Sequence, residues 1–570
     1  MSKLKIIFKT NLFVIINLFL IKPFVLRSRI KLFGSYNPKY YPKNIKPNNI
    51  VQIESSFINK ELLGNFIKEK SLYYNSNNNQ FFNRSKLYIY WNNNYGQKPV
   101  DSEIINASHR FFWILFEYNK NINYYFNEIK DWIKLFQNKK DNLAWHPYNT
   151  SERICNWLVF LGCCLQKKRD SELVSSINKQ INFLIYNLEY PASKIVNNHI
   201  LNNARALYFS GSVLNRIDVK ELGKELFYNH IKTLISNKGF LHECSVHYQL
   251  LINKWLIEIF ILAQLTKDQK FIKFLLPIIN SINKASSFFI ISNKIEINNF
   301  PRIGDISPDM PFDYFNPFAK NKNKSHSNWN IKPINYKFKK RNSYIDGWLK
   351  QYFGDWTLFS YTHPNLDQYP HGHGHNDFSS ICLYYKSIPI IIDIGAKSYD
   401  VTNADFDNGR SANDHSSLLI NEKSVIEPGI GYKSIWSSLI RKKAKFQISK
   451  NNLIWSGSTL DNIKWTRHIK NKDNVGIRIT DTILNNRNHI LKSSFYLSNH
   501  IQFKYSEDNV FVFKCVENFI HFKFSKISKV NISETFKYDN YGVQSKIQKL
   551  TYMNINFDKQ SSLDITIKAN

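Results

Sequence analysis

The chain has 570 residues, of which 43% are hydrophobic and 15% aromatic. This composition belongs to a folded globular protein and excludes a disordered, collagen-like or low-complexity chain. At roughly 150 residues per domain, the length suits two or three domains with sizeable cores. The 77 Lys and Arg exceed the 44 Asp and Glu and give a net charge of +33. Because Lys is spread along the whole chain, this charge is compatible with a lysine-rich surface that has no specific partner. The alternative is a polyanionic partner, namely nucleic acid, an anionic membrane or an acidic polysaccharide.

The N-terminal segment, residues 1–45, is basic and apolar. Lys3, Lys5 and Lys9 precede an apolar run over residues 12–21, which is the order of a secretory signal peptide, but no small-x-small cleavage site follows. The run is shorter than the roughly 20 residues that a membrane span needs. Two interpretations stay open: an export or anchoring sequence, or an uncleaved amphipathic helix that contacts a membrane surface.

The first half of the chain is predicted to be helical. Between about residues 50 and 290 the apolar residues recur at spacings of three and four, as on one face of the run from Tyr248 to Phe260. Similar segments cover residues 111–116 and 129–136. Around residues 301–345 the pattern breaks into Pro, Gly, Asn and Lys, which indicates a domain junction. We therefore predict a helical domain over residues 46–325.

The second half of the chain consists of short β-rich runs separated by turn residues. Two runs that flank Lys386 and Ser387 predict a β-hairpin. No helical period lies between the runs, so residues 326–570 are predicted to form an antiparallel β-sandwich. The predicted strands are residues 380–385, 388–394, 446–448, 475–483 and 510–513.

A group of histidines marks the start of the predicted sandwich. Residues 363–377 hold four of the chain's 16 histidines. In an extended segment His373 and His375 project to the same face, because side chains alternate along a strand. Asp393 closes the returning strand and His415 follows, so imidazoles and a carboxylate from separate segments match a three-ligand zinc site. The alternative interpretation is a surface run of titrating histidines.

Two polar clusters lie in the predicted helical half. Asn198 and His199 open a helical run that contains Arg205, and Glu243 and Tyr248 belong to a second histidine-containing segment. Singly, each has a plain structural explanation as a helix cap, a surface ion pair or a core aromatic residue. Together, an amide, imidazoles and a phenol are the groups that proton abstraction next to a carboxylate requires.

Several other catalytic signatures are missing from the sequence. An H-E-x-x-H zinc motif that starts at His242 would need a histidine at position 246, where the chain has Val246. No G-x-S-x-G, P-loop or G-x-G-x-x-G motif is present. The six cysteines form no C-x-x-C pair. Nucleotide chemistry and serine hydrolysis therefore lose support, whereas a glycosidase with paired carboxylates stays an alternative.

Seven segments, in order along the chain, resemble motifs of the heparinase II/III superfamily of polysaccharide lyases. Any one is weak, whereas the ordered set spans both predicted domains and is specific. The resemblance implies an incomplete α/α-toroid followed by an antiparallel β-sandwich. The segments are PYNTSERICNW (Pro147–Trp157), NNHILNNARAL (Asn197–Leu207), GFLHECSVHY (Gly239–Tyr248), RIGDISP (Arg302–Pro308), HGHGHNDFSS (His371–Ser380), DIGAKSY (Asp393–Tyr399) and GRSANDHSSLLIN (Gly409–Asn421).

The resemblance implies a lyase that cleaves a uronate-containing polysaccharide by β-elimination. This reaction removes the C5 proton, whose acidity depends on neutralising the adjacent carboxylate. By resemblance, Asn198 and His199 neutralise that carboxylate, and Tyr248 and His373 supply base and acid in an order that stays open. A tyrosine with an unperturbed pKa near 10 is a poor base at neutral pH, so a basic role would need nearby positive charge.

The resemblance also implies a zinc ion. It would be held by His375, Asp393 and His415. Its expected role is structural, since it would hold the sandwich loops and so orient His373, instead of activating a water molecule. We further predict substrate contacts from Arg205, Glu243, Tyr399 and Arg410. The chain departs from the family pattern at Asn197, Gln249, Asn376 and Ser416, so its substrate contacts are expected to differ from those of well-known members.

An alternative function from another class is a catalytically weak or silent polysaccharide-binding protein of capsule or lipopolysaccharide assembly. A nucleic-acid binder has only the charge in its favour and no recognisable module, so we expect no nucleic-acid partner. The family association implies the cell envelope or periplasm, with the cytoplasm as the alternative.

Overall fold

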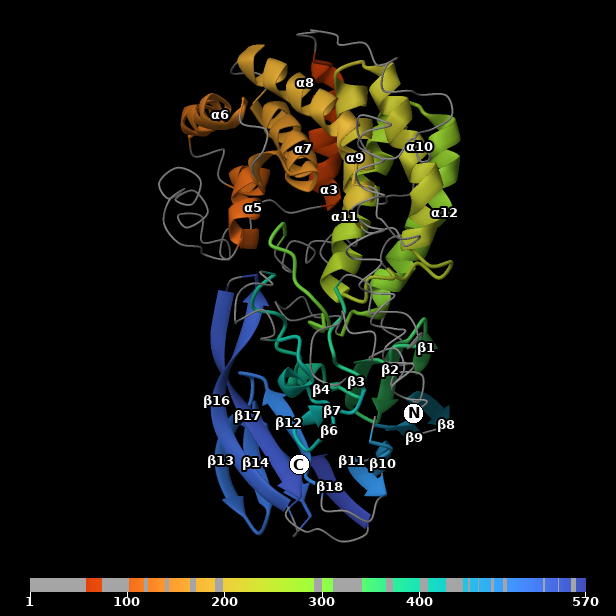
Figure 1. Ribbon diagram of the computed structural model, residues 1–570, viewed down its shortest axis with the longest axis vertical. Coiled ribbons are helices and arrows are strands. Elements are labelled where there is room, and N and C mark those ends of the chain that lie inside the picture. The colour runs from red at the N-terminus through yellow and green to blue at the C-terminus, as the bar shows by residue number, and fades with distance from the viewer. Residues whose placement is uncertain are drawn as a thin grey trace, which may run out of the picture. The chain divides into compact units, whose positions relative to one another are not determined.

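The computed structural model describes most of the chain as two compact units, each built mainly from one type of secondary structure (Figure 1). The helical unit comprises the described residues up to Leu234, except 102–103, and those of Lys254–Leu276. The sheet unit comprises 102–103, Ile235–Asn253 and the described residues from Pro277 to Asn570. The predicted N-terminal segment lies outside the described residues. These residues are 58–73, 102–116, 121–138, 143–164, 171–189, 198–291, 300–310, 341–364, 373–399, 409–426, 444–449, 452–459, 461–472, 476–484, 489–525, 528–541, 543–554 and 560–570.

The helical unit is assembled around two almost completely buried helices, α7 and α9. Tertiary packing, more than amphipathic patterning, specifies such helices, because they are buried on nearly every side. At Gly223 a Cβ would lie 2.5 Å from the backbone nitrogen of Tyr208, so helices α9 and α10 pack backbone to backbone. The helices are α3 (Lys60–Tyr73), α5 (Ser102–Arg110), α6 (Ile122–Phe136), α7 (Pro147–Cys164), α8 (Ser171–Tyr186), α9 (Asn198–Val213), α10 (Ile217–Leu234), α11 (Val246–Leu265) and α12 (Gln269–Phe288).

The predicted helical segments are found, with one difference in type. The run from Tyr248 to Phe260 lies within α11, and the segment 129–136 forms the second half of α6. Residues Phe112–Phe116 form a short 3₁₀ helix instead of an α-helix, since Phe111 before it has a φ of 59° and turns the chain. Among the described residues, α11 is long and apolar enough to cross a membrane, but it is completely buried inside the structure, as a core helix is.

The sheet unit contains two antiparallel sheets. In the first, the strand order is β1-β2-β3-β4-β5-β12-β17-β16, and β6 pairs with β12 while β7 pairs with β6; in the second it is β13-β14-β15-β18-β11-β10-β9-β8. The first half of the strands is β1 (Ser343–Ile345), β2 (Trp348–Phe353), β3 (Trp356–Tyr361), β4 (Cys382–Tyr385), β5 (Ile388–Ile391), β6 (Leu419–Ile420), β7 (Lys423–Ser424), β8 (Lys445–Ser449) and β9 (Asn452–Ser458). The second half is β10 (Lys464–Lys472), β11 (Gly476–Leu484), β12 (Leu491–Leu497), β13 (Gln502–Glu507), β14 (Val510–Cys515), β15 (Asn518–Phe524), β16 (Ser528–Asn540), β17 (Val543–Asn554) and β18 (Gln560–Ala569).

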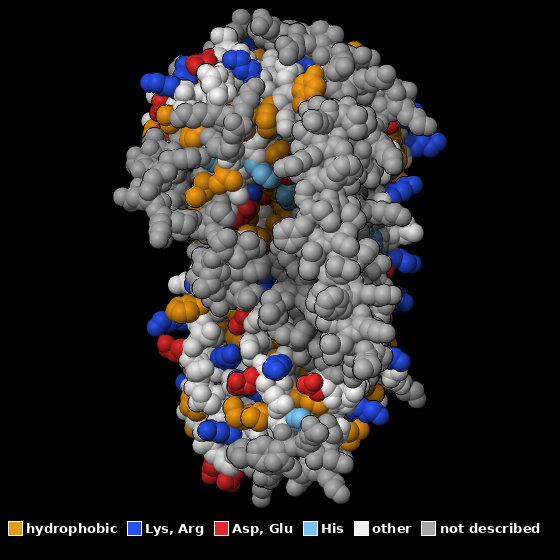
Figure 2. Space-filling view, viewed as in Figure 1, with side chains coloured by type: hydrophobic (Ala, Val, Ile, Leu, Met, Phe, Trp, Pro, Cys, Tyr) orange, Lys and Arg blue, Asp and Glu red, His pale blue; other side chains and the backbone are white. Residues whose placement is uncertain are grey.

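One hydrophobic core joins the inward faces of both sheets. It includes Trp356 from the first sheet and Trp455 and Trp465 from the second, each at most 1% exposed. The predicted hairpin is β4–β5, and its turn residues Lys386 and Ser387 both have positive φ, as a two-residue turn between twisted strands requires. Helices followed by antiparallel sheets are therefore the observed order. On the described surface in view, Lys and Arg of the sheet unit are interspersed with Asp and Glu (Figure 2).

A buried ion pair lies inside this core. Arg467 and Asp481, on the paired strands β10 and β11, are both fully buried and form two hydrogen bonds of 2.7 and 2.8 Å. Arg467 also donates to the backbone carbonyls of Ser379 and Ser416, which belong to loops outside the strands. The guanidinium therefore ties two loops to the middle of the second sheet.

Removing only the cationic partner should strongly destabilise the sheet unit. We expect Arg467→Met to lower its free energy of unfolding by about 3–5 kcal/mol, because Asp481 would stay buried without a counter-charge. The double variant Arg467→Met/Asp481→Leu should recover much of this loss. The neighbouring but half-exposed pair Arg478–Asp564 provides the control, since Arg478→Met should cost about 1 kcal/mol or less. Equal losses in urea unfolding for the two single variants would contradict this account.

Candidate active site and metal cluster

The segment before and at the start of helix α11 holds the loop of residues 302–310 in place. Val246 donates its backbone N–H to the carbonyl of Ile303 at 3.0 Å, and the Ser245 hydroxyl donates to the backbone carbonyl of Asp305 at 2.7 Å. Gly304 has a φ of +83°, and a Cβ there would lie 2.6 Å from the carbonyl oxygen of Cys244. This close approach requires glycine and brings the next residue, Asp305, beneath the histidine segment.

His247 holds the same loop through both ring nitrogens. Its Nδ1 accepts the backbone N–H of Ser307 at 3.2 Å, so the proton resides on Nε2, which donates to the carbonyl of Met310 at 2.6 Å. Burial lowers the pKa of His247 to about 4. His247 is therefore a neutral structural residue at physiological pH.

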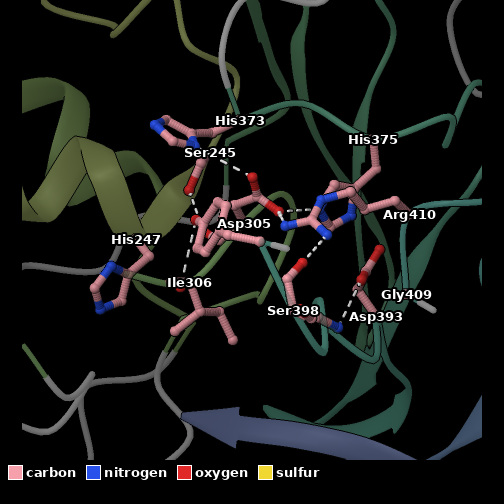
Figure 3. Close-up of polar contacts among 12 residues, drawn as sticks. Ser245, His247, Asp305, Ile306, His373, His375, Asp393, Ser398, Gly409 and Arg410 are labelled. Carbon is pink, nitrogen blue, oxygen red and sulfur yellow. Dashed lines mark hydrogen bonds and ion pairs between the residues drawn. The ribbon is translucent and has the colours of Figure 1, made fainter. Parts of the chain in front are cut away.

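Asp305 lies at the centre of the site, with its carboxylate 4% exposed (Figure 3). One oxygen interacts with His373 Nδ1 at 3.2 Å, and the other interacts with His375 Nε2 at 2.9 Å and with Arg410 at 2.7 Å. Burial alone would raise the pKa of Asp305, but Arg410 and the two histidines hold it well below its usual range. The ionised carboxylate thus connects both members of the H-x-H pair, which the alternation of side chains had predicted to share a face.

Tyr248 and His373 lie face to face. Their ring centroids are 3.5 Å apart with an angle of 13° between the planes, and the backbone N–H of His373 is held by the carbonyl of Glu243 at 3.2 Å. The hydroxyl of Tyr399 donates to that of Tyr248 at 3.3 Å. Burial raises the pKa of Tyr248 well above 10, so its phenol is protonated at neutral pH.

Tyr399 and Arg410 support this pair from one side. The Tyr399 ring stacks on Tyr541 at 5.3 Å, and its backbone N–H donates to the Tyr541 hydroxyl at 2.9 Å. Arg410 lies 4.9 Å above the Tyr399 ring, is 5% exposed, and donates to the carbonyl of Ser398. In this structure Arg410 therefore acts as the counter-charge of Asp305 (Figure 3).

The three predicted metal ligands come together in the sheet unit. His375, Asp393 and His415 are all buried, and one ligand atom from each lies within 4.8 Å of the others. Among the described residues, His375 Nδ1 and His415 Nε2 have no hydrogen-bond partner, while the opposite ring nitrogens contact Asp305 and Asp393 at 2.9 and 2.8 Å. Two buried imidazole nitrogens beside a carboxylate, each ring oriented through its other nitrogen, fit a bound cation.

Protonation of His415 reflects the same concentration of negative charge. Burial lowers the pKa of His415, but the Asp393 carboxylate overcomes this effect and raises it to about 9. A cation that bound at this imidazole would displace the proton, as metal binding to histidine generally does.

The helical unit contains a second histidine cluster. Asn198 is the first residue of α9 and is 1% exposed, whereas the side chain of His199 is 36% exposed. His199 Nδ1 lies 2.8 Å from the carboxylate of Glu189, and its ring packs against Tyr148 with centroids 4.8 Å apart. The same Glu189 oxygen is 3.7 Å from His146. One carboxylate is thus shared by two imidazoles.

Two of the predicted substrate-binding residues, Arg205 and Glu243, are buried instead of exposed to solvent. Arg205 is 2% exposed and forms ion pairs with Glu152 and Glu258 at 2.8 and 2.9 Å. Glu243 is 2% exposed and precedes helix α11. The side chains of Arg205 and Glu243 are thus both buried.

Two residues with central positions were not singled out from the sequence. Asp305 lies within RIGDISP, one of the seven matching segments, where the only local signal was an acidic residue directly after a glycine. Glu189 lies outside those segments, and its role depends on contacts with α9 and with the residue before α7. Neither position shows a periodicity that would reveal it.

The C-terminal part of the chain matches a known sequence family. Residues 347–560 match the sequence profile described as heparinase II/III-like, C-terminal. No curated protein matches the chain. This match covers most of the sheet unit, and it supports the resemblance to the heparinase II/III superfamily that the ordered motifs indicate.

Solved structures share the fold through both units. A heparinase III crystal structure is 16% identical with a TM-score of 0.65, and the match covers 93% of this chain and 88% of that one. A second heparinase III is 14% identical with a TM-score of 0.56, covering 93% and 87%. A heparan sulfate lyase from Pedobacter heparinus is 14% identical with a TM-score of 0.51, covering 83% and 78%. These matches confirm the predicted α/α-toroid followed by a β-sandwich.

The buried neutral state of His247 predicts a specific pH dependence. Its pKa is lower in the folded protein than in the unfolded chain, so only the unfolded chain gains a proton as the pH falls from 6.5 towards 4. Stability from this residue is complete above pH 6.5 and decreases below it. The cost of His247→Gln should therefore be about 2 kcal/mol smaller at pH 5 than at pH 7. Denaturant unfolding at both pH values measures this difference, and an equal cost at both would rule out the assignment.

Proposed function

We propose that this protein is a polysaccharide lyase that cleaves a uronate-containing acidic polysaccharide by β-elimination. The observation that carries the proposal is the stacked pair of Tyr248 and His373, with His373 oriented by a buried, ionised Asp305. A phenol and an imidazole in one rigid arrangement provide the two proton-transfer groups that elimination requires. The shared fold with proteins named heparinase and heparan sulfate lyase supports an acidic polysaccharide as the substrate.

The electrostatics favour one assignment of base and acid. When His373 Nδ1–H donates to Asp305, the lone pair of the neutral ring resides on Nε2, which suits this nitrogen for removing the C5 proton. Tyr248 keeps its proton because burial raises its pKa, and it can donate that proton to the leaving glycosidic oxygen. The opposite assignment would make Tyr248 the base, which requires a deprotonated phenol and therefore a nearby cation that lowers the pKa of Tyr248.

Neutralisation of the substrate carboxylate is assigned to Asn198 and His199. An amide donor and an imidazole adjacent in sequence can both donate to carboxylate oxygens and so stabilise the charge that develops on the enolate. The Glu189 carboxylate next to His199 favours a proton on its Nδ1 and limits rotation of the ring. The pair is thereby prepared to act as a donor.

A zinc ion held by His375, Asp393 and His415 is proposed as a structural component. When bound, a divalent ion would supply positive charge that holds these three buried side chains together. His375 contacts the carboxylate that also contacts His373, so fixing His375 would limit the movement of His373. The residues of the chain, and not the ion, would carry the proton transfers.

Lyase activity should depend on the stacked pair. Purified protein incubated with a panel of uronate polymers should form an unsaturated product that absorbs near 230 nm, roughly, and Tyr248→Phe and His373→Ala should each lower the rate by about 10²–10⁴-fold. Tyr505→Phe, at a tyrosine that is 52% exposed in β13, should leave the rate unchanged. If no polymer gives product while binding persists in both variants, the protein is instead a catalytically silent polysaccharide-binding protein.

The metal proposal is tested by elemental analysis. Protein purified with zinc should contain about one equivalent, and His375→Ala or His415→Ala should lose it because each removes one of three ligands. His468→Ala, in strand β10 and outside the cluster, serves as the control and should keep its zinc. Undiminished zinc in His375→Ala would remove this site from consideration.

A further inference from the structure

The sheet unit contains a cavity of about 670 Å³ whose lining includes none of the residues proposed for catalysis or metal binding. Its walls come from the turn at residues 237–240, from helix α12, and from strands β1 and β2 with the two residues before β1. This volume lies within the range of small-molecule binding sites. The cavity is therefore large enough to hold a sugar residue.

The charge of the lining is of one sign. Lys238, Lys284, Arg341 and Lys350 all contribute to the cavity, and no Asp or Glu is among its described lining residues. These four residues come from separate elements that the fold brings together. The carboxylate of nearby Asp346 accepts a hydrogen bond from Ser236 at 2.6 Å and is not part of the lining. The cavity therefore concentrates positive charge.

The turn that carries Lys238 is held firmly against helix α12. Gly239 has a φ of +89°, and a Cβ at this position would lie 2.2 Å from the backbone oxygen of Ser281 in α12. The Ser236 hydroxyl accepts the backbone N–H groups of Lys238 and Phe240 at 3.2 and 3.1 Å. Lys238 and Lys284 thus reach the cavity from two backbones whose separation is set by direct packing.

Lys350 provides a buried cation at the wall. It is 7% exposed, and its ammonium donates to the carbonyls of Phe288 and Ile290 at 3.0 and 2.7 Å, where α12 ends. These bonds stabilise the end of the helix. Burial lowers the pKa of Lys350 to about 7, so its charged form is costly in this environment. An anion in the cavity would offset part of that cost.

The remaining lining groups suit a saccharide. Tyr344 and Tyr352 supply aromatic surface, and Asn237 and Asn342 supply amide groups, next to the cationic side chains. Aromatic surface contacts the apolar face of a sugar ring, amides bond its hydroxyls, and cations pair with an attached carboxylate or sulfate. The same three kinds of group would give little affinity for a neutral apolar molecule.

We propose that this cavity is a second polysaccharide-binding site, which takes an acidic sugar residue away from the residues assigned to catalysis. The proposal rests on the proposed function only for the choice of ligand. A site of this kind would retain a polymeric substrate between cleavage events, because two contacts on one chain raise its effective concentration.

The test measures binding of a hexuronate trisaccharide by calorimetry in the Tyr248→Phe variant, which limits turnover. In this background we expect two binding sites, and Lys238→Glu/Lys284→Glu should weaken binding at the cavity site by at least about 10-fold. Both lysine side chains are exposed, so these substitutions reverse two charges without disturbing the hydrophobic core. The matched control is Lys514→Glu/Lys523→Glu on strands β14 and β15, which makes the same change in net charge. It should change the affinity by less than about 2-fold.

Three comparisons decide the outcome. Equal weakening by both double variants would show that only the overall charge matters and would overturn the proposal. Equal binding of a neutral trisaccharide would overturn it as well, whereas competition by inorganic sulfate would support recognition of the acidic group. If the trisaccharide binds and requires Lys238 and Lys284 although no polymer is cleaved, the cavity site stands and the lyase function fails. If polymers are cleaved but the lysines are without effect, only the cavity site fails.

Discussion

The candidate active site depends on one buried carboxylate. A carboxylate removed from water is stable only when cations and hydrogen-bond donors surround it, and Asp305 obtains these from His373, His375 and Arg410. The requirement acts in both directions, because each partner is oriented by the carboxylate it satisfies. A proposed base, a proposed metal ligand and a buried arginine are therefore fixed by a single group that performs no chemistry itself.

The same physical device recurs in the loops of the sheet unit. Asp393 orients His415, and Asp481 holds Arg467, whose guanidinium donates to the backbone carbonyl of Ser416, the residue after His415. The proposed metal cluster is thus connected through one peptide unit to an ion pair in the core of the sandwich. Loops have few apolar contacts of their own, so buried charge pairs give them a unique conformation that packing alone would not specify.

The surplus of positive charge contributes little to the specificity of the proposed sites. On the face in view, both signs of charge are interspersed over the sheet unit (Figure 2), and the proposed catalytic groups are neutral or locally paired. Four cations do converge at the cavity beside α12, where a polyanion would find a specific contact. Long-range attraction by the remaining lysines would increase the rate of encounter with an acidic polymer without selecting it.

The sequence by itself determined the order of helices and strands, the β4–β5 hairpin and the residue types of the site, because periodicity and ordered motifs are local properties of the chain. It also placed His373 and His375 on one face, which follows from strand geometry. Only the tertiary structure decided that both meet Asp305, that Arg205 is committed to Glu152 and Glu258, and that Tyr248 lies flat on His373. The ion-pair partners of Asp305 and Arg205 lie 53 to 105 residues away, and burial sets their charge states, so no local pattern could reveal them.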